Sequence, residues 1–189
     1  MKIFDCTNYF NEDMMYGLRL EILDKYVDKF VVAEARYSHS GEPKKLNFDI
    51  NRYPNFKDRI IYIVVDNEPA DLTDLNNLSY NQAQGMKRMN SLKRIRQQYD
   101  ALSEGINDAS KDDLIILSDC DEIPNLKNLE KLNPSQIIVF KQLLFYYKFD
   151  LHHDAMTWHG SKGCLKKNLK TFNWLRNIKN KKYNFWRVD

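Results

Sequence analysis

Three acidic residues follow directly after an apolar segment in the stretch DDLIILSDCDEIP, residues 112–124. Asp119 and Asp121 are separated by one residue, and Glu122 comes next. Two carboxylates at this spacing on a turn can point to the same side, where they repel one another unless a cation lies between them. Such oxygen ligands suit Mg²⁺ or Mn²⁺, and an ion of this kind neutralises a phosphate or diphosphate group. The stretch therefore predicts a divalent-metal site, and the alternative interpretation is an acidic turn leading into the next segment.

The segments that would position this turn alternate between strand-like and helix-like patterns. Apolar runs of strand length occur at 2–4, 29–35, 59–65, 113–118 and 136–141, and another follows at 143–149. The first of these runs are continuously apolar, which is typical of parallel strands covered on both faces. Helical spacing of apolar residues occurs between them, so the order predicts an α/β domain with a mostly parallel sheet and helices on both faces. In such sheets ligands bind beyond the carboxyl ends of the strands, where Asp119 to Glu122 would lie.

Two helices and one loop are predicted in more detail. In residues 11–27, Asn11 is the expected N-cap, and the expected buried face consists of Met14, Leu18, Ile22 and Leu23. In residues 86–106, the residues at helical spacing are Leu92, Ile95, Tyr99 and Leu102. The polar, Asn-rich residues 68–84 are predicted to form a surface loop.

Composition limits the class of protein. The 189 residues fit one domain, and the formal net charge of +3 is too small to indicate nucleic acid as the partner. The cysteines are three and far apart in sequence, so reduced thiols are expected rather than a disulfide framework or a zinc knuckle. There is no signal-peptide pattern, and the longest apolar runs are too short to span a membrane. We therefore expect a cytoplasmic enzyme without a membrane segment.

The acidic turn is compatible with two chemistries. In nucleotide-sugar transfer a D-x-D motif holds the metal on the donor diphosphate, whereas in haloacid-dehalogenase-like phosphatases the first Asp is the nucleophile. The phosphatase motif normally follows the first strand and has Thr or Val two residues after the second Asp. Here the motif lies far into the chain, and Ile123 occupies that place. The sequence favours nucleotide-sugar transfer.

Five stretches in order together resemble glycosyltransferase family 17, which includes β-1,4-mannosyl-glycoprotein 4-β-N-acetylglucosaminyltransferases. They are IFDCTNYFNEDMMYGLRLEIL, FVVAEARYSHSGEPKKLNF, KDRIIYIVVD, RIRQQYDAL and DDLIILSDCDEIP, with weaker similarity in LLFYYKFD and TWHGSKGC. The resemblance implies a GT-A fold, a UDP-sugar donor, expected to be UDP-N-acetylglucosamine, and a divalent metal, Mn²⁺ or Mg²⁺. It also implies a glycan acceptor, polysaccharide, lipid-linked or protein-linked, and inversion at the anomeric carbon.

The resemblance also assigns roles to single residues. Asp119 and Asp121 match the metal-binding D-x-D, and Glu122 beside them is expected to be catalytic. The other matching positions are Glu34 in the V-x-E-A strand end, His39, Ser40, Gly41 and Pro43 in H-S-G-x-P, and Arg94 and Gln98 in the helix motif R-E-x-x-Q-R. Glu34 and Asp66 are expected at the nucleoside end of the donor, and Arg94 and Gln98 are expected to shape its pocket.

This sequence departs from the family pattern at three places. In the helix motif, Ile95 replaces the Glu and Tyr99 replaces the second Arg, which would alter the donor site if those residues support it. Family members continue beyond a segment such as NFWRVD, so we expect residues 1–189 to form one GT-A-like domain that lacks the family's C-terminal part.

The remaining candidates concern the acceptor side and the C-terminal segment. Asp154 follows two histidines in an expected acceptor-side loop and is a speculative base, while a dedicated metal site there is disfavoured because adjacent strand residues face opposite ways. From Ser161 to the end, nine basic residues and one acid mix with Phe172, Trp174, Tyr183, Phe185 and Trp186. We interpret that segment first as a packed aromatic edge, then as a diphosphate lid, and last as a nucleic-acid surface. The alternative to an enzyme is a non-catalytic nucleotide- or nucleic-acid-binding remnant, and a D-x-D phosphatase ranks third.

Overall fold

A six-stranded sheet forms the centre of the computed structural model, which describes residues 1–131, 136–148 and 150–178. Its strand order is β3-β2-β1-β4-β6-β5. The first four strands are parallel, and β6 runs antiparallel to both of its neighbours. The strands are β1 (Ile3–Asn8), β2 (Lys29–Ala35), β3 (Ile60–Val65), β4 (Leu114–Ser118), β5 (Ile138–Val139) and β6 (Lys162–Leu165). The mixed α/β fold with a mostly parallel sheet is therefore confirmed.

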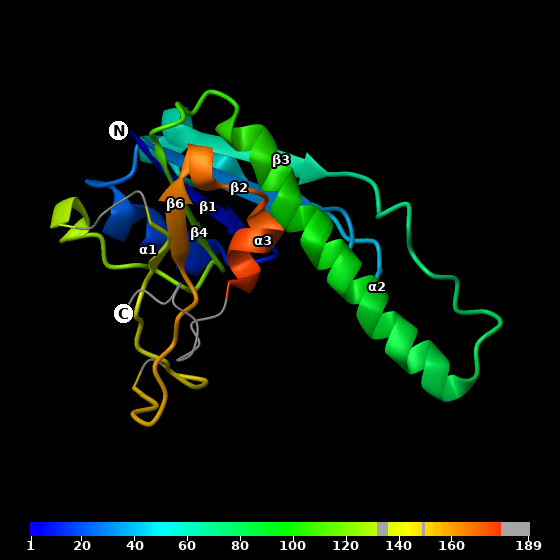
Figure 1. Ribbon diagram of the computed structural model, residues 1–189. Coiled ribbons are helices and arrows are strands. Elements are labelled where there is room, and N and C mark those ends of the chain that lie inside the picture. The colour runs from blue at the N-terminus through cyan, green and yellow to red at the C-terminus, as the bar shows by residue number, and fades with distance from the viewer. Residues whose placement is uncertain (132–135, 149, 179–189) are drawn as a thin grey trace.

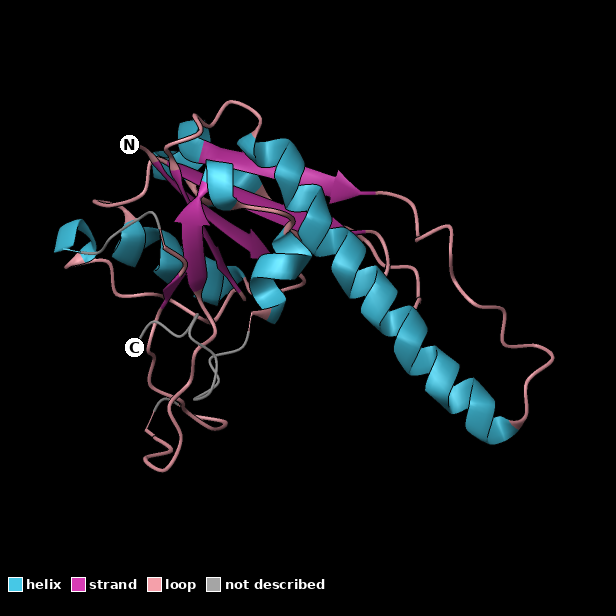
Figure 2. Cartoon of the chain, viewed as in Figure 1, coloured by secondary structure: helices cyan, strands magenta, loops and turns pink. Residues whose placement is uncertain are grey.

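Helices cover both faces of the sheet, as expected (Figures 1 and 2). The described residues form three α-helices, α1 (Asp13–Leu23), α2 (Tyr80–Ala101) and α3 (Phe172–Asn177). One apolar cluster joins α1 to side chains such as Val32 and Ile116, and a second joins α2 and α3 to side chains such as Val31 and Ile115. Successive strand residues thus alternate between the two faces. Short 3₁₀ helices occupy Ile50–Arg52, Pro54–Arg59, Leu102–Ile106, Leu129–Lys131 and Lys166–Asn168.

The predicted buried face of α1 is wrong except at Leu23. Met14, Leu18 and Ile22 are 76%, 45% and 46% exposed. The residues of α1 that are buried are Tyr16, Arg19, Leu20 and Leu23. The physical reason is that Arg19, a charged side chain, turns inward to an acidic partner on β1, which rotates the helix relative to its apolar pattern. The helix also begins after Glu12, not after Asn11.

The helix α2 begins within the segment that was expected to be loop. It starts at Tyr80 because Ser79 and Gln82 form a capping box, in which each side chain bonds to the other residue's backbone N–H. The loop predicted over 68–84 therefore ends about one turn early. Ile95, Tyr99 and Leu102 pack on the sheet as expected, whereas Leu92 is 47% exposed. The N-terminal part of α2 extends beyond the sheet (Figure 1).

The second half of the chain follows the prediction less closely. Residues 143–149 contain no strand in their described part and make only one isolated bridge, Phe145 to His152. Strand β6 was not predicted, and β5 is much shorter than the run at 136–141. Phe172 is buried and Trp174 packs against the same cluster, which fits the packed aromatic edge; Tyr183, Phe185 and Trp186 lie outside the described residues.

The remaining expectations concern the cysteines and the presence of a membrane-spanning helix. The three cysteines, which were expected to be reduced thiols, are free and buried. Across the residues that the structure describes, no helix has both the length and the apolar character needed to cross a membrane.

Candidate active site

The D-x-D segment forms a tight turn directly after β4. The Glu122 N–H donates to the Asp119 carbonyl oxygen at 3.0 Å, and the Asp119 N–H donates to Glu122 Oε2 at 2.9 Å. Strand β4 lies between β1 and β6 at the centre of the sheet and is buried along its whole length. The turn is therefore delivered to the carboxyl edge of the sheet, where the sequence predicts it.

A buried ion pair between α1 and β1 anchors the main chain of this turn. Arg19 of α1 bonds both carboxylate oxygens of Asp5 on β1, at 2.7 and 2.6 Å, and the two side chains are 0% and 1% exposed. The remaining guanidinium nitrogen donates to the carbonyl oxygens of Glu122 and Asp119, at 2.9 and 3.4 Å. A buried charge is stable only when it is paired and hydrogen-bonded, and here four acceptors satisfy it. The ion pair thus fixes the main chain of the turn to α1 and β1.

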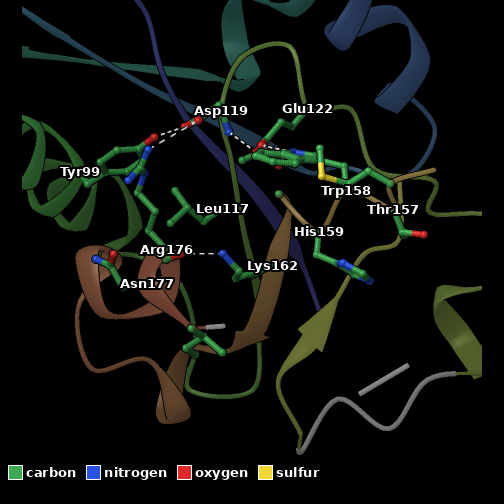
Figure 3. Close-up of a pocket in the computed structure, with 14 residues that line it drawn as sticks. Tyr99, Leu117, Asp119, Glu122, Thr157, Trp158, His159, Lys162, Arg176 and Asn177 are labelled. Atoms are coloured by element: carbon green, nitrogen blue, oxygen red, sulfur yellow. Dashed lines mark hydrogen bonds and ion pairs between the residues drawn. The ribbon is translucent and has the colours of Figure 1, made fainter. Parts of the chain in front are cut away.

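The Asp119 side chain contacts α2 and α3 (Figure 3). The Tyr99 hydroxyl donates to Asp119 Oδ1. Arg176 Nη2 lies 3.8 Å from Asp119 Oδ2, and the Arg176 guanidinium covers the Tyr99 ring at 4.8 Å. Burial raises the pKa of the Tyr99 hydroxyl well above its ordinary value, and the nearby Asp119 carboxylate raises that pKa further. Tyr99 therefore stays protonated and acts as a hydrogen-bond donor.

One cleft of about 480 Å³ opens between the ends of β1 and β4, and we call it the β1 cleft. Chain order reverses here, because β2 and β3 follow β1 on one side and β4 lies on the other. Such a switch point is the usual ligand site of an open α/β sheet. The cleft is lined by Asn8, Tyr9, Phe10, Glu12, Met15, Tyr37, His39, Lys44, Ile95, Gln98, Tyr99, Asp119, Cys120, Asp121 and Arg176.

A second cleft of about 490 Å³ lies on the other side of Asp119, beside β6, and we call it the β6 cleft. Its lining includes Glu122, residues 156–160 and Lys162 (Figure 3). These residues reach the same sheet edge because β6 is antiparallel to β4, with Lys162 beside Leu117. The segment before β6 therefore lies next to the segment after β4.

Glu122 is the central acid of the β6 cleft. The Trp158 indole N–H donates to Glu122 Oε1 at 2.6 Å, and a Cβ added at Gly160 would lie 1.9 Å from that oxygen. Burial raises the pKa of Glu122, and the backbone N–H of Asp119 and the indole N–H act against that rise. Each carboxylate oxygen retains a second lone pair for another hydrogen bond. Glu122 is thus a positioned proton acceptor with an elevated pKa.

The same cleft is also lined by a lysine, Lys162. Lys162 Nζ donates to the Arg176 carbonyl oxygen at 2.5 Å, and burial lowers the pKa of the Lys162 ammonium. Tyr99, Asp119 and Arg176 line both clefts, which therefore adjoin at Asp119. Ligands held in the two clefts would meet beside that residue.

The structure brings five of the predicted residues to these clefts: Asp119, Asp121, Glu122, Gln98 and, from the H-S-G-x-P motif, His39. Asp119 and Asp121 line the β1 cleft together, and Glu122 lines the β6 cleft. Gln98 also lines the β1 cleft, where its side-chain amide donates to the Ala33 carbonyl oxygen at 3.0 Å.

Glu34 does not reach either cleft. It is fully buried beneath the segment that follows β2. Its carboxylate accepts hydrogen bonds from the Asn47 and Phe48 N–H groups at 2.8 and 3.0 Å. The Tyr62 hydroxyl donates to it at 2.8 Å, and Lys44 forms an ion pair with it. Glu34 therefore shapes the wall of the β1 cleft through Lys44 and does not present a carboxylate to a ligand.

Arg94 acts on the H-S-G-x-P turn. It pairs with Glu68 and donates to the His39 carbonyl oxygen at 3.4 Å. Gly41 has a φ of +98°, and an added Cβ there would lie 2.5 Å from the guanidinium. The motif thus needs glycine both for its backbone conformation and for the close approach of Arg94.

The last two candidates lie away from the acidic turn. Asp66 pairs with Arg36 at 2.5 Å, and both side chains are more than half exposed. Asp154 is 90% exposed, pairs with His152 at 2.6 Å, and lines neither cleft.

Several residues of the site were not found from sequence. These residues are Arg19, Trp158, Lys162 and Arg176. The first three lie in stretches that resemble the family, but the resemblance assigned them no role, and their partners in the site are distant in the chain. Tyr99 did carry a signal, because it replaces an Arg of the family motif, and the structure gives it a direct bond to Asp119.

The residues present fit a divalent cation that is held partly by protein carboxylates and partly by the oxygens of a bound diphosphate. Within residues 1–131, 136–148 and 150–178, no group of three or more His, Cys, Asp or Glu residues is placed to enclose a metal ion. Mg²⁺ typically uses one or two carboxylates together with substrate phosphates and water. Asp119 and Asp121 supply such a pair at one cleft.

Fold and site together define an α/β domain with two adjoining clefts at the carboxyl edge of its sheet. Residues 1–180 match the family model described as glycosyltransferase family 17. The chain belongs to glycosyltransferase family 17 and is therefore a glycosyltransferase, a class that implies a nucleotide-sugar donor and a glycan acceptor. A comparison with curated proteins found no match. Among solved structures, a 2-C-methyl-D-erythritol 4-phosphate cytidylyltransferase of Francisella tularensis is similar, with a TM-score of 0.43 and 10% identity over 88% of this chain and 74% of that chain.

Proposed function

We propose that this glycosyltransferase moves N-acetylglucosamine from UDP-N-acetylglucosamine to a hydroxyl group of a glycan, with inversion at the anomeric carbon. The observation that carries the proposal is the position of Asp119 and Asp121, which line the switch-point cleft while Asp119 also borders the β6 cleft. This arrangement supports a GT-A type of site, with donor diphosphate and acceptor on either side of one aspartate.

Asp119 and Asp121 would hold Mn²⁺ or Mg²⁺ together with the diphosphate. When bound there, the ion would neutralise the diphosphate and so help it to leave. Arg176 supplies a further positive charge at the same point, since its guanidinium lies 3.8 Å from Asp119 and borders both clefts. Tyr99 keeps the Asp119 carboxylate oriented by its hydrogen bond.

Glu122 is our candidate for the general base. Inversion requires the acceptor oxygen to attack the anomeric carbon while the bond to the diphosphate breaks, and a base takes the hydroxyl proton. Glu122 lies in the β6 cleft with two fixed hydrogen bonds and a raised pKa, which favours proton acceptance. Asp154 is exposed and lines neither cleft, so the geometry favours Glu122 for this role.

The experiment that tests the proposal is calorimetric titration with UDP, in Mn²⁺ and then in EDTA. Wild type is compared with the Asp119→Asn, Asp121→Asn double variant, and release of UDP from UDP-N-acetylglucosamine is assayed with a set of glycan acceptors. We expect binding that requires both the metal and the aspartates, and we expect Glu122→Gln to retain binding while it loses transfer. Metal-independent binding or full activity in the double variant would overturn the metal role, and no UDP binding would overturn the donor assignment.

A further inference from the structure

Two buried polar atoms without a partner belong to residues of the β1 cleft. Among the described residues, Asn8 Oδ1 and the Tyr37 hydroxyl have no hydrogen-bond partner, although both atoms are inaccessible to solvent. Both residues line the β1 cleft. An unsatisfied buried polar group destabilises the folded chain by about 1–3 kcal/mol, so such atoms call for an explanation. A ligand in the cleft would supply the missing partners.

The strand order places the residues that carry these two atoms one after the other along the cleft. Asn8 ends β1 and pairs with Ala33 of β2 on one side. On the other side it lies one residue beyond Thr7 and Ser118, which are paired, so Asn8 is level with Asp119. Tyr37 follows the end of β2. Adjacent strands lie about 4.8 Å apart, so Asn8 lies one strand away from the acidic turn. Tyr37 lies on the continuation of the next strand, four residues beyond Ala33, the partner of Asn8.

A nucleoside diphosphate has the same order of groups. Diphosphate, ribose and base follow one another along the molecule, so a nucleotide laid across these strand ends meets β4, β1 and β2 in turn. An Asn Oδ1 atom accepts hydrogen bonds and a ribose hydroxyl donates them, whereas a Tyr hydroxyl can donate to a carbonyl oxygen of a base. The aromatic ring of Phe10 lines the same cleft and is 52% exposed, which provides a surface for stacking.

We propose that Asn8 and Tyr37 form the nucleoside subsite of the donor: Asn8 Oδ1 accepts from a ribose hydroxyl, and the Tyr37 hydroxyl donates to a carbonyl oxygen of uracil. This inference rests on the proposed UDP-sugar donor. It gives the nucleoside end to residues other than Glu34 and Asp66, whose carboxylates are paired with protein cations and do not line the cleft.

The test uses three ligands in the presence of Mn²⁺: UDP, 2′,3′-dideoxy-UDP, and ribose 5-diphosphate, which has no base. Removing one neutral hydrogen bond is expected to weaken binding about three- to tenfold. Asn8→Ala should weaken binding of UDP and ribose 5-diphosphate but not of dideoxy-UDP. Tyr37→Phe should weaken binding of UDP and dideoxy-UDP but not of ribose 5-diphosphate.

Tyr16→Phe is the matched control, because the Tyr16 hydroxyl is also buried without a partner but lies in the core and lines neither cleft. It should bind all three ligands like wild type. The melting temperatures of the three variants show whether each is folded. Wild-type affinity for UDP in both Asn8→Ala and Tyr37→Phe would overturn the subsite alone. A wild type that binds no UDP would instead overturn the proposed donor.

Discussion

Replacement of Arg19 by methionine tests whether the buried ion pair organises the site. Methionine keeps an unbranched apolar side chain but removes the charge, which leaves the Asp5 carboxylate buried at 1% exposure without a partner cation. Breaking a buried pair in this way costs about 3–5 kcal/mol. A domain of this kind is stable by about 5–15 kcal/mol, so the loss is a large share of the free energy of unfolding.

The measurement is urea unfolding of wild type and Arg19→Met with linear extrapolation to water. Arg36→Met is the matched control, since the Arg36–Asp66 pair has similar length but its side chains are 52% and 60% exposed. An exposed pair contributes about 0–1 kcal/mol, so this variant should unfold close to wild type. Equal destabilisation of the two variants would refute the reasoning.

A double variant tests separately how the Asp5–Arg19 ion pair contributes to stability and how it contributes to the backbone position of the turn. Asp5→Leu with Arg19→Met replaces both charges by apolar groups, which is often close to neutral for stability. We expect it to recover most of the free energy that Arg19→Met loses. UDP binding should be weaker than in wild type in both Arg19→Met and the double variant, because the Asp119 and Glu122 carbonyl oxygens lack their donor in both. Recovery of full binding would show that the turn does not depend on Arg19.

Two further predictions concern Glu122. Gly160→Ala places a Cβ 1.9 Å from Glu122 Oε1, so transfer should fall about 100-fold while UDP binding is retained. Gly85→Ala, whose Cβ meets nothing within 4 Å, is the control, and unchanged transfer in Gly160→Ala would contradict the base assignment. Trp158→Phe removes the indole hydrogen bond that favours the charged carboxylate, so the pKa of Glu122 should rise. Because the base must be deprotonated, the acidic limb of the kcat/KM profile should move to higher pH, and a shift to lower pH would show that another group titrates.

The strands and the position of the acidic turn could be predicted because their signals are local. Continuous apolar runs marked β2, β3 and β4, and the D-x-D segment directly follows the last of these. Strands that are buried on both faces contain few polar residues, so their apolar pattern can be recognised without knowing which strands are neighbours.

The rest of the site depends on contacts that sequence spacing does not reveal. The inward face of α1 is set by Arg19, which is stable inside only because Asp5 lies on the neighbouring strand. Strand β6 has the sequence KGCL, which carries no β-branched residue, and its place is set by pairing with β4. Trp158 and Lys162 reach Glu122 only through that pairing, so they could not be assigned before the sheet was known.

The attachment of the acidic turn through its carbonyl oxygens has a consequence for how this site can change. Arg19 holds the main chain of Asp119 and Glu122, and it makes no bond to either carboxylate. This attachment of the backbone therefore does not involve the Asp119 and Asp121 carboxylates. Substitution at Asp119 or Asp121 can alter the chemistry without removing this support for the loop, so the same scaffold can carry different ligand sets through evolution.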